Sequence, residues 1–265
     1  MDSFALITGS SSGIGLEIAK SLAKRGHNLI LTARREALLE KYAKEISNNF
    51  NVKVKFIAVD LGLTGAPQEI FEFCKNNNYF VNILVNNAGY GIKTPFHETS
   101  IEDEENFIRV LGTSVIMTTK LFLPMMLEKN EGKIMIVSSV AAFAAPSAIQ
   151  ALYGPIKTFM NRFSDSINVN YNHKGITSTA VCPGFTSTGF HEASGVQEEM
   201  DRVPNFMVFS SQRVAEEAVN ATLKGKSLCV PTKTYKFLVF LIKNIPETIT
   251  RALGAIFAPG RYNRD

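Results

Sequence analysis

A strand followed at once by a glycine-rich turn opens the chain, and this order constrains the fold more than any other feature. The apolar run over residues 4–8 is typical of a buried strand. Gly9, Gly13 and Gly15 follow it, and a helix with an apolar face begins near Ile14. Glycines let the backbone approach a pyrophosphate closely, and a helix N-terminus presents free N–H groups to the anion. The segment therefore predicts a dinucleotide-binding unit.

Strand-like and helix-like segments alternate along the rest of the chain. The predicted strands cover residues 28–33, 53–59, 82–85, 133–137, 177–181 and 227–230. The predicted helices cover residues 38–46, 67–75, 101–127 and 157–170, with one more that begins at an N-cap on Ser211. Alternation of this kind produces a parallel sheet with helices on both faces. We expect an α/β fold, a Rossmann-like doubly wound sheet of about seven strands in one domain (1–230), followed by a C-terminal helical extension (231–265).

Composition excludes several function classes. The 265 residues are 45% hydrophobic and 20% charged, as in soluble globular proteins. The net charge of +4 is too small and dispersed to indicate a nucleic-acid partner. Cys74, Cys182 and Cys229 are too far apart to suggest disulfides or zinc, and the four histidines lack metal-ligand spacing, so no metal is expected. Because we find no signal peptide and no run of about 18 apolar residues, we expect a cytoplasmic location.

Polar residues collect where the predicted strands end, which is where parallel sheets bind ligands. The fourth strand ends in Asn86-Asn87-Ala88-Gly89, the fifth in Ser138-Ser139 and the sixth in Pro183-Gly184. Tyr153 and Lys157 follow the fifth strand, and residues four apart on a helix share a face. A nearby ammonium lowers the pKa of a phenol toward the value that general acid–base catalysis requires. One of the two serine hydroxyls could then hold a carbonyl or alcohol oxygen.

In this order and spacing the motifs resemble the short-chain dehydrogenases/reductases, over roughly residues 4–230. The resemblance rests on the Thr8–Gly15 turn, Asp60, the Asn86–Gly89 segment, the serine pair, the tyrosine–lysine pair and Pro183-Gly184. It implies that Tyr153 donates a proton, that Lys157 binds the nicotinamide ribose and lowers the tyrosine pKa, and that Ser139 orients the carbonyl. It also implies a homodimer or homotetramer. The cofactor contacts that it implies are Gly9, Ser11, Ser12, Gly13, Ile14, Gly15, Asp60, Leu61, Asn87, Ala88, Gly89, Tyr153, Lys157 and Thr188.

The end of the second predicted strand bears on the choice of cofactor. An acidic residue there would bind the ribose 2′-hydroxyl of NAD. The strand instead ends in Arg34-Arg35, with no carboxylate before Glu36. Arginine pairs with a 2′-phosphate through its planar guanidinium. We therefore expect NADP(H), with Arg34 as the contact; the alternative is a solvated arginine pair that opens a helix.

Three positions depart from the family pattern. Arg109 stands three residues before Gly112, where the family carries an asparagine of its proton relay; with the register shifted by one, Arg109 is an ordinary surface residue. Pro155 lies between the tyrosine and the lysine, so the helix either begins near Gly154 or is distorted there. Ser139 precedes the tyrosine by 14 residues, slightly more than is usual, which indicates an extra loop residue or a role for the preceding serine.

The last part of the chain changes character. Residues 231–265 hold six basic and two acidic residues, a net charge of +4 that equals that of the whole chain, together with an apolar run over 237–242. Such a segment either lies on an anionic membrane surface, covers the substrate pocket or forms a dimer contact. The phenylalanines after the sixth strand are either core residues or part of a substrate lid: Phe185, Phe190, Phe206 and Phe209.

Together these features predict an NADP(H)-dependent oxidoreductase. It would reduce a carbonyl, or oxidise the alcohol, of a lipophilic small molecule by hydride transfer, with Tyr153 as general acid/base. The alternative is a catalytically impaired NADP-binding sensor or scaffold of the same fold, which Arg109 and Pro155 keep open.

Overall fold

Seven parallel strands form one sheet in the computed structural model, in the order β3-β2-β1-β4-β5-β6-β9. The structure describes residues 2–92, 94–144, 151–188, 203–246 and 248–249. The strands are β1 (Ser3–Thr8), β2 (Asn28–Ala33), β3 (Val54–Ala58), β4 (Phe80–Asn86), β5 (Gly132–Val137), β6 (Ile176–Val181) and β9 (Leu228–Cys229). A separate short pair joins β7 (Thr186–Ser187) to β8 (Phe209–Ser210). The predicted Rossmann-like sheet is confirmed.

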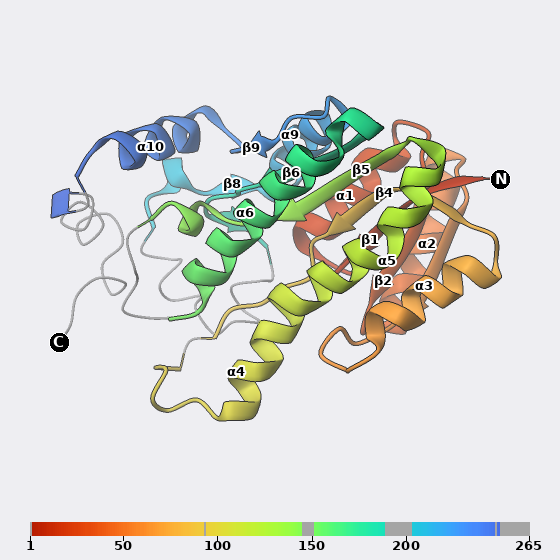
Figure 1. Ribbon diagram of the computed structural model, residues 1–265, viewed down its shortest axis with the longest axis horizontal. Helices are drawn as coiled ribbons and strands as arrows, with labels where there is room; N and C mark the ends of the chain where they lie inside the picture. Colours follow the sequence, from red (N-terminus) through yellow and green to blue (C-terminus); the bar gives the residue numbers. More distant parts are fainter. Residues whose placement is uncertain (1, 93, 145–150, 189–202, 247, 250–265) are drawn as a thin grey trace.

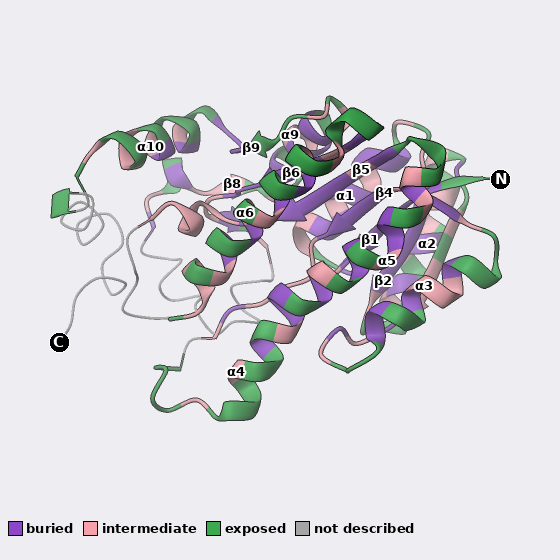
Figure 2. Ribbon diagram, viewed as in Figure 1, coloured by how far each residue is buried: buried purple, intermediate pink, exposed green. Residues whose placement is uncertain are grey.

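Helices cover both faces of the sheet (Figure 1). They are α1 (Gly13–Ala23), α2 (Glu36–Phe50), α3 (Ala66–Asn76), α4 (Ile101–Ile108), α5 (Ser114–Lys129), α6 (Tyr153–Tyr171), α9 (Ser211–Leu223) and α10 (Lys233–Asn244). One apolar cluster joins α1, α2 and α9 to one face, and a second joins α3, α5 and α6 to the other. Alternate strand residues serve the two clusters, as Ile7 and Leu6 do in β1, so the sheet is buried on both faces (Figure 2).

The strand order reverses between β1 and β4, and this fixes where a ligand can bind. Chain connections leave the carboxyl ends of these two neighbours toward opposite faces of the sheet, which opens a crevice between them. The glycine-rich turn follows β1 and the Asn87-Ala88-Gly89 segment follows β4. The two motifs therefore face one another across the crevice.

The long predicted helix is interrupted by a π-helical turn. Residues Arg109–Thr113 form this turn between α4 and α5. The whole stretch, Ile101–Lys129, is long and apolar enough to cross a membrane by length and composition alone, so the expectation that no such run exists was wrong. More than half of its apolar window, 56%, is buried inside the fold, and this burial accounts for the apolar composition as that of a core helix.

Helix α10 lies at the end of the molecule opposite the N-terminus (Figure 1). The predicted N-cap of α9 was wrong by one residue: Ser210, rather than Ser211, accepts a hydrogen bond from the Arg213 N–H, at 3.3 Å. In α10, Tyr235 and Val239 join an apolar cluster with Cys182, Val203, Met207 and Val230. The division of the chain at residue 230 stays a prediction.

Candidate active site

The turn after β1 is held in shape by Asn87. Its side-chain amide donates hydrogen bonds to the carbonyl oxygens of Thr8 (2.9 Å) and Gly9 (3.2 Å). Gly9 has φ +66° and Gly13 has φ +57°, a region that favours glycine. A Cβ on Gly15 would collide with both the Asn87 amide and the Gly9 carbonyl. Gly9 and Gly15 are thus required by the closeness of the turn to the end of β4, and Gly13 by its backbone conformation.

A threonine at each side completes this part of the site. The Thr8 hydroxyl accepts hydrogen bonds from the N–H groups of Asn87 (2.9 Å) and Ala88 (3.0 Å), which ties β1 to the end of β4. Thr188 lies against the turn from the other side, since a Cβ on Gly13 would be 3.3 Å from the Thr188 Cβ. The structure therefore brings Thr188 to the glycine-rich turn, 175 positions away in the sequence.

Arg35 contacts the same turn, and the sequence reasoning missed this contact. Its guanidinium donates to the hydroxyls of Ser11 (3.0 Å) and Ser12 (3.1 Å). Arg34, the predicted contact, is exposed at the same end of β2. The sequence did offer a signal: two adjacent arginines follow β2, and two adjacent serines, Ser11 and Ser12, stand in the turn after the neighbouring strand β1. One cation with two hydroxyls is a suitable set of donors for a phosphate group.

The end of β3 supplies the other predicted cofactor residues. The Asp60 carboxylate accepts a hydrogen bond from the Gly62 N–H at 2.9 Å, which closes a tight turn after the strand. Leu61, in this turn, is buried in the apolar cluster of α3 and α5. Ile14 packs on the opposite cluster. The residues predicted from the glycine-rich turn thus lie together after β1, whereas Asp60 and Leu61 follow β3, two strands away in the sheet.

The tyrosine–lysine pair lies in the first turn of α6. The helix begins at Tyr153, and the Ile156 N–H donates to the Leu152 carbonyl at 2.9 Å. Pro155 is the third residue of the helix, where an N–H has no partner within the helix, so the missing N–H of proline costs no helical hydrogen bond. The alternative of a helix that begins near Gly154 therefore holds. The Lys157 ammonium lies 5.5 Å from the centre of the Tyr153 ring.

Lys157 is buried, and its ammonium is fixed by the sheet. The side chain is 6% exposed, and Nζ donates to the Val137 carbonyl at the end of β5 (2.9 Å). Burial disfavours the charged form and lowers the pKa of Lys157 to about 8. Burial also raises the pKa of the neighbouring Cys182 thiol to about 11, so this thiol is neutral near pH 7. The titratable Lys157 ammonium therefore lies next to the phenol of Tyr153, and the neutral Cys182 thiol does not form an ion pair with it.

The two serines at the end of β5 have different surroundings. Ser138 is 3% exposed and donates to the Lys157 backbone carbonyl at 3.0 Å, so it joins the sheet to α6. Ser139 is half-buried, and its oxygen accepts from the Ala141 N–H at 3.1 Å. Acceptance of that bond orients the Ser139 oxygen while its O–H can still donate. This geometry favours Ser139 over Ser138 as the hydroxyl that meets a substrate oxygen.

The π-helical turn presents Leu111, rather than Arg109, to the tyrosine. Leu111 belongs to the apolar cluster that packs against Tyr153, and it also lies beside Gly89. Arg109 is half-buried and donates to the Thr64 hydroxyl at 3.3 Å. The sequence could not show whether Leu111 or Arg109 lies toward the tyrosine, because the π-helical turn adds a residue and changes which side chains face the sheet.

Apolar side chains adjoin the polar groups on two sides. Those packed with Tyr153 and the π-helical turn are Tyr90, Ile92, Leu152 and Ile156. Those that follow Ser139 and pack with the C-terminal cluster are Val140 and Phe143, joined by Phe185 and Phe209. Phe185 and Phe209 are partly buried and pack against this cluster, whereas Phe206 is 64% exposed and Phe190 lies outside the described residues.

A glycine-rich turn at the switch point of a parallel sheet, with a tyrosine and a buried lysine beside it, defines an oxidoreductase of the dinucleotide-binding class. The chain belongs to the short chain dehydrogenase family, whose family model matches residues 3–199. The resemblance seen in the sequence is confirmed.

Among curated proteins, the chain is similar to a very-long-chain 3-oxoacyl-CoA reductase of Bos taurus. The identity is 34% over 191 residues, which cover 70% of this chain and 60% of the cattle protein. A very-long-chain 3-oxoacyl-CoA reductase-like protein of Arabidopsis thaliana is 30% identical over 252 residues, 93% of this chain and 78% of that protein. Among solved structures, a short-chain dehydrogenase from Sphingobium yanoikuyae in complex with NADPH has a TM-score of 0.81 at 24% identity, over 100% of this chain and 98% of that one. That likeness supports the fold.

Proposed function

We propose that the protein is an NADP(H)-dependent reductase of lipophilic carbonyl compounds, with long-chain 3-oxoacyl thioesters as the first substrates to test. The observation that carries the proposal is the buried Lys157 ammonium, 5.5 Å from the centre of the Tyr153 ring in the first turn of α6. A phenol that must release and regain a proton near neutral pH needs such a neighbour.

The residues around the pair can divide the reaction among them. The cofactor, when bound, supplies the hydride that the carbonyl carbon accepts. The Ser139 hydroxyl donates a hydrogen bond to the carbonyl oxygen, and Tyr153 donates the proton that converts this oxygen to a hydroxyl. The Lys157 ammonium stabilises the phenolate that Tyr153 leaves behind. The glycine-rich turn supports a bound pyrophosphate, because it leads directly into the N-terminus of α1, whose free N–H groups favour an anion.

Two facts support a lipophilic substrate. Apolar side chains pack around Tyr153 and follow Ser139, so a hydrocarbon chain would meet favourable surroundings on either side of the carbonyl. The curated relatives carry names that specify very-long-chain 3-oxoacyl-CoA reduction. No reported relative is a sensor or scaffold, so the alternative function gains no support. Assembly as a homodimer or homotetramer and a cytoplasmic location remain predictions.

The preference for NADPH is tested by Arg35→Ala. Loss of the guanidinium beside Ser11 and Ser12 removes a charge-assisted contact to the 2′-phosphate, of about 1.5–3 kcal/mol. We expect the Kd for NADPH to rise about 10- to 100-fold, while the weaker Kd for NADH stays within twofold, both by fluorescence titration. Lys41→Ala, an exposed cation on α2, is the control. Equal binding of the two cofactors by the unmodified protein would contradict the NADP(H) assignment.

A separate observation favours contact with a membrane surface. Phe237 and Phe240 on the outward face of α10 are 63% and 60% exposed, and three lysines accompany them, Lys233, Lys236 and Lys243. Exposed aromatic side chains with cations on one helix are typical of helices that lie on anionic bilayers. We propose that α10 binds such a surface peripherally, which would keep the reductase near lipophilic substrates.

Vesicle co-sedimentation tests this contact. We expect the protein to pellet with phosphatidylcholine vesicles that contain 30% phosphatidylserine, because the anionic lipid attracts the lysines of α10. Pelleting with pure phosphatidylcholine vesicles should be much weaker. Phe237→Ser with Phe240→Ser should weaken pelleting at least about tenfold, because the two aromatic side chains that would enter the bilayer are lost. Phe96→Ser, at a side chain that is 57% exposed in the segment before α4, should pellet as the unmodified protein does. Pelleting that is absent, or unaffected by the double change, would refute the membrane contact.

A further inference from the structure

Tyr235 of α10 lies under the loop that follows β6, and it is buried almost completely, at 1% exposure. Its ring covers Gly184, where any Cβ would collide with the ring carbons. Its hydroxyl accepts a hydrogen bond from the Phe185 N–H (3.0 Å) and donates one to the Met207 carbonyl (2.8 Å). One phenol thus joins two chain segments that are 22 residues apart.

These two segments are the strands of the short β7-β8 pair and the residues that precede them. The Phe209 N–H donates to the Phe185 carbonyl at 3.1 Å, and β7 pairs with β8 from Thr186 onward. The Tyr235 hydroxyl therefore fixes the end of the pair that lies nearest the main sheet.

The contact continues to the serine of the active site. The Val140 N–H, next to Ser139, donates to the Pro183 carbonyl at 2.9 Å. Pro183 immediately precedes Gly184, on which the Tyr235 ring lies. The path from Tyr235 to the residue beside Ser139 thus consists of one ring contact, one peptide bond and one hydrogen bond.

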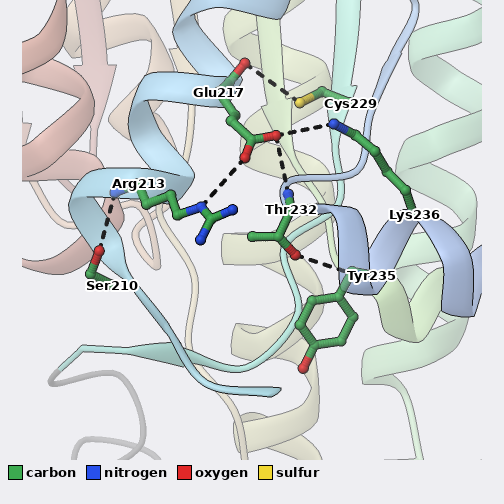
Figure 3. Close-up of polar contacts among 7 residues, drawn as sticks. All are labelled: Ser210, Arg213, Glu217, Cys229, Thr232, Tyr235 and Lys236. Carbon is green, nitrogen blue, oxygen red and sulfur yellow. Dashed lines mark hydrogen bonds and ion pairs between the residues drawn. The ribbon is translucent and has the colours of Figure 1, made fainter. Parts of the chain in front are cut away.

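A carboxylate holds α10 in the orientation that aims Tyr235 inward. Glu217 of α9 accepts hydrogen bonds from the Thr232 N–H and from Lys236 Nζ, both at 3.1 Å, and pairs with Arg213 at 3.7 Å (Figure 3). Thr232 has φ +70°, which is strained for a β-branched residue and must be maintained by its surroundings. Its hydroxyl accepts from the Tyr235 N–H at 3.4 Å and caps the helix.

We propose that Tyr235 is a positioning residue for the carbonyl substrate: it fixes the wall formed by residues 183–187 and 205–209 relative to Ser139. This inference rests on the proposed reductase function. Cofactor binding should be nearly independent of Tyr235, because Thr188 has its own contact with Gly13 on the glycine-rich turn.

Tyr235→Phe removes one oxygen atom and keeps the ring over Gly184. The Phe185 N–H and the Met207 carbonyl then lose their partner in a buried place, so the wall is in position for a smaller fraction of the time. The apparent substrate affinity falls in proportion to the fraction of protein in which the wall is in position. We expect KM for a long-chain 3-oxoacyl thioester to rise about tenfold, with kcat within threefold and the Kd for NADPH within twofold of the unmodified protein.

Two controls separate positioning from loss of stability. Tyr171→Phe, at the far end of α6, removes a hydroxyl of the same kind and should leave KM unchanged. Phe122→Leu, in the core between α3 and α5, should lower Tm at least as much as Tyr235→Phe with no change in KM. A rise in KM that simply follows Tm through all three variants would overturn the proposal.

Hydrogen exchange of the Phe185 amide gives a readout that needs no activity. In Tyr235→Phe this amide loses its acceptor, and its exchange should quicken about tenfold, whereas in Tyr171→Phe it should not change. Unchanged exchange and unchanged KM would refute the role of Tyr235. If exchange quickens but the unmodified protein reduces no carbonyl compound, the hydrogen bond from Phe185 to Tyr235 is established. The proposed reductase function is then refuted, and the positioning of a substrate by Tyr235 is refuted with it.

Discussion

Tyr153→Phe is expected to lower kcat for carbonyl reduction at least about 1,000-fold, because it removes the proton donor and leaves the ring in place. Tyr153 packs against the buried cluster of Phe107, Val110 and Leu111, a contact that phenylalanine preserves. The fold and the Kd for NADPH should therefore stay within twofold of the unmodified protein. Single-turnover loss of NADPH absorbance measures the chemical step apart from binding.

Tyr42→Phe provides the matched control, since it removes a phenol hydroxyl from α2, remote from α6. Its kcat should equal that of the unmodified protein. Turnover by Tyr153→Phe at a tenth of the normal rate or more would mean that another group supplies the proton, and the assignment of Tyr153 as general acid would be lost.

Lys157→Met is expected to lower kcat about 100- to 1,000-fold, because it removes the cation that stabilises the phenolate and keeps the length of the side chain. The pH profile gives a sharper test. Burial lowers the pKa of Lys157 to about 8, so the ammonium is present below this pH and is lost as the pH rises through it. The rate of reduction by the unmodified protein should therefore fall above about pH 8.

That alkaline limb should vanish in Lys157→Met, whose low rate has no ammonium left to titrate. Lys120→Met, an exposed lysine on α5, should keep both the rate and the limb. A limb near pH 8 that persists in Lys157→Met would assign the titration to another group, and Lys157 would then act only on the ribose.

The fold was predictable because it follows from patterns of neighbouring residues. Alternation of apolar strands with amphipathic helices specifies a parallel sheet, and short polar motifs at the strand ends then fall at one edge. Tyr153 and Lys157 were predicted together for the same reason, because four positions on one helix determine their proximity. Pro155 looked disruptive only because the start of the helix was unknown, and at its third residue the proline is harmless.

What the sequence could not provide depends on contacts between distant segments. Arg35 contacts Ser11 and Ser12 only once β1 and β2 are paired. Because Arg34 is also an arginine, the sequence alone does not show which of the two makes this contact. The contacts of Tyr235 with Phe185 and Met207 need the strained turn at Thr232, which no propensity predicts. The π-helical turn that brings Leu111 toward Tyr153 likewise leaves no recognisable sequence pattern.

Transfer of deuterium from the cofactor to the substrate tests the central claim most directly. The protein is incubated with NADPH that carries deuterium at both C4 positions of the nicotinamide and with a long-chain 3-oxoacyl thioester, and the product is weighed by mass spectrometry. The account predicts a 3-hydroxyacyl product with one deuterium on the former carbonyl carbon, formed by the unmodified protein and not by Tyr153→Phe. Tight NADPH binding without deuterium in a product from this thioester or from any of a panel of hydrophobic ketones and aldehydes would contradict it.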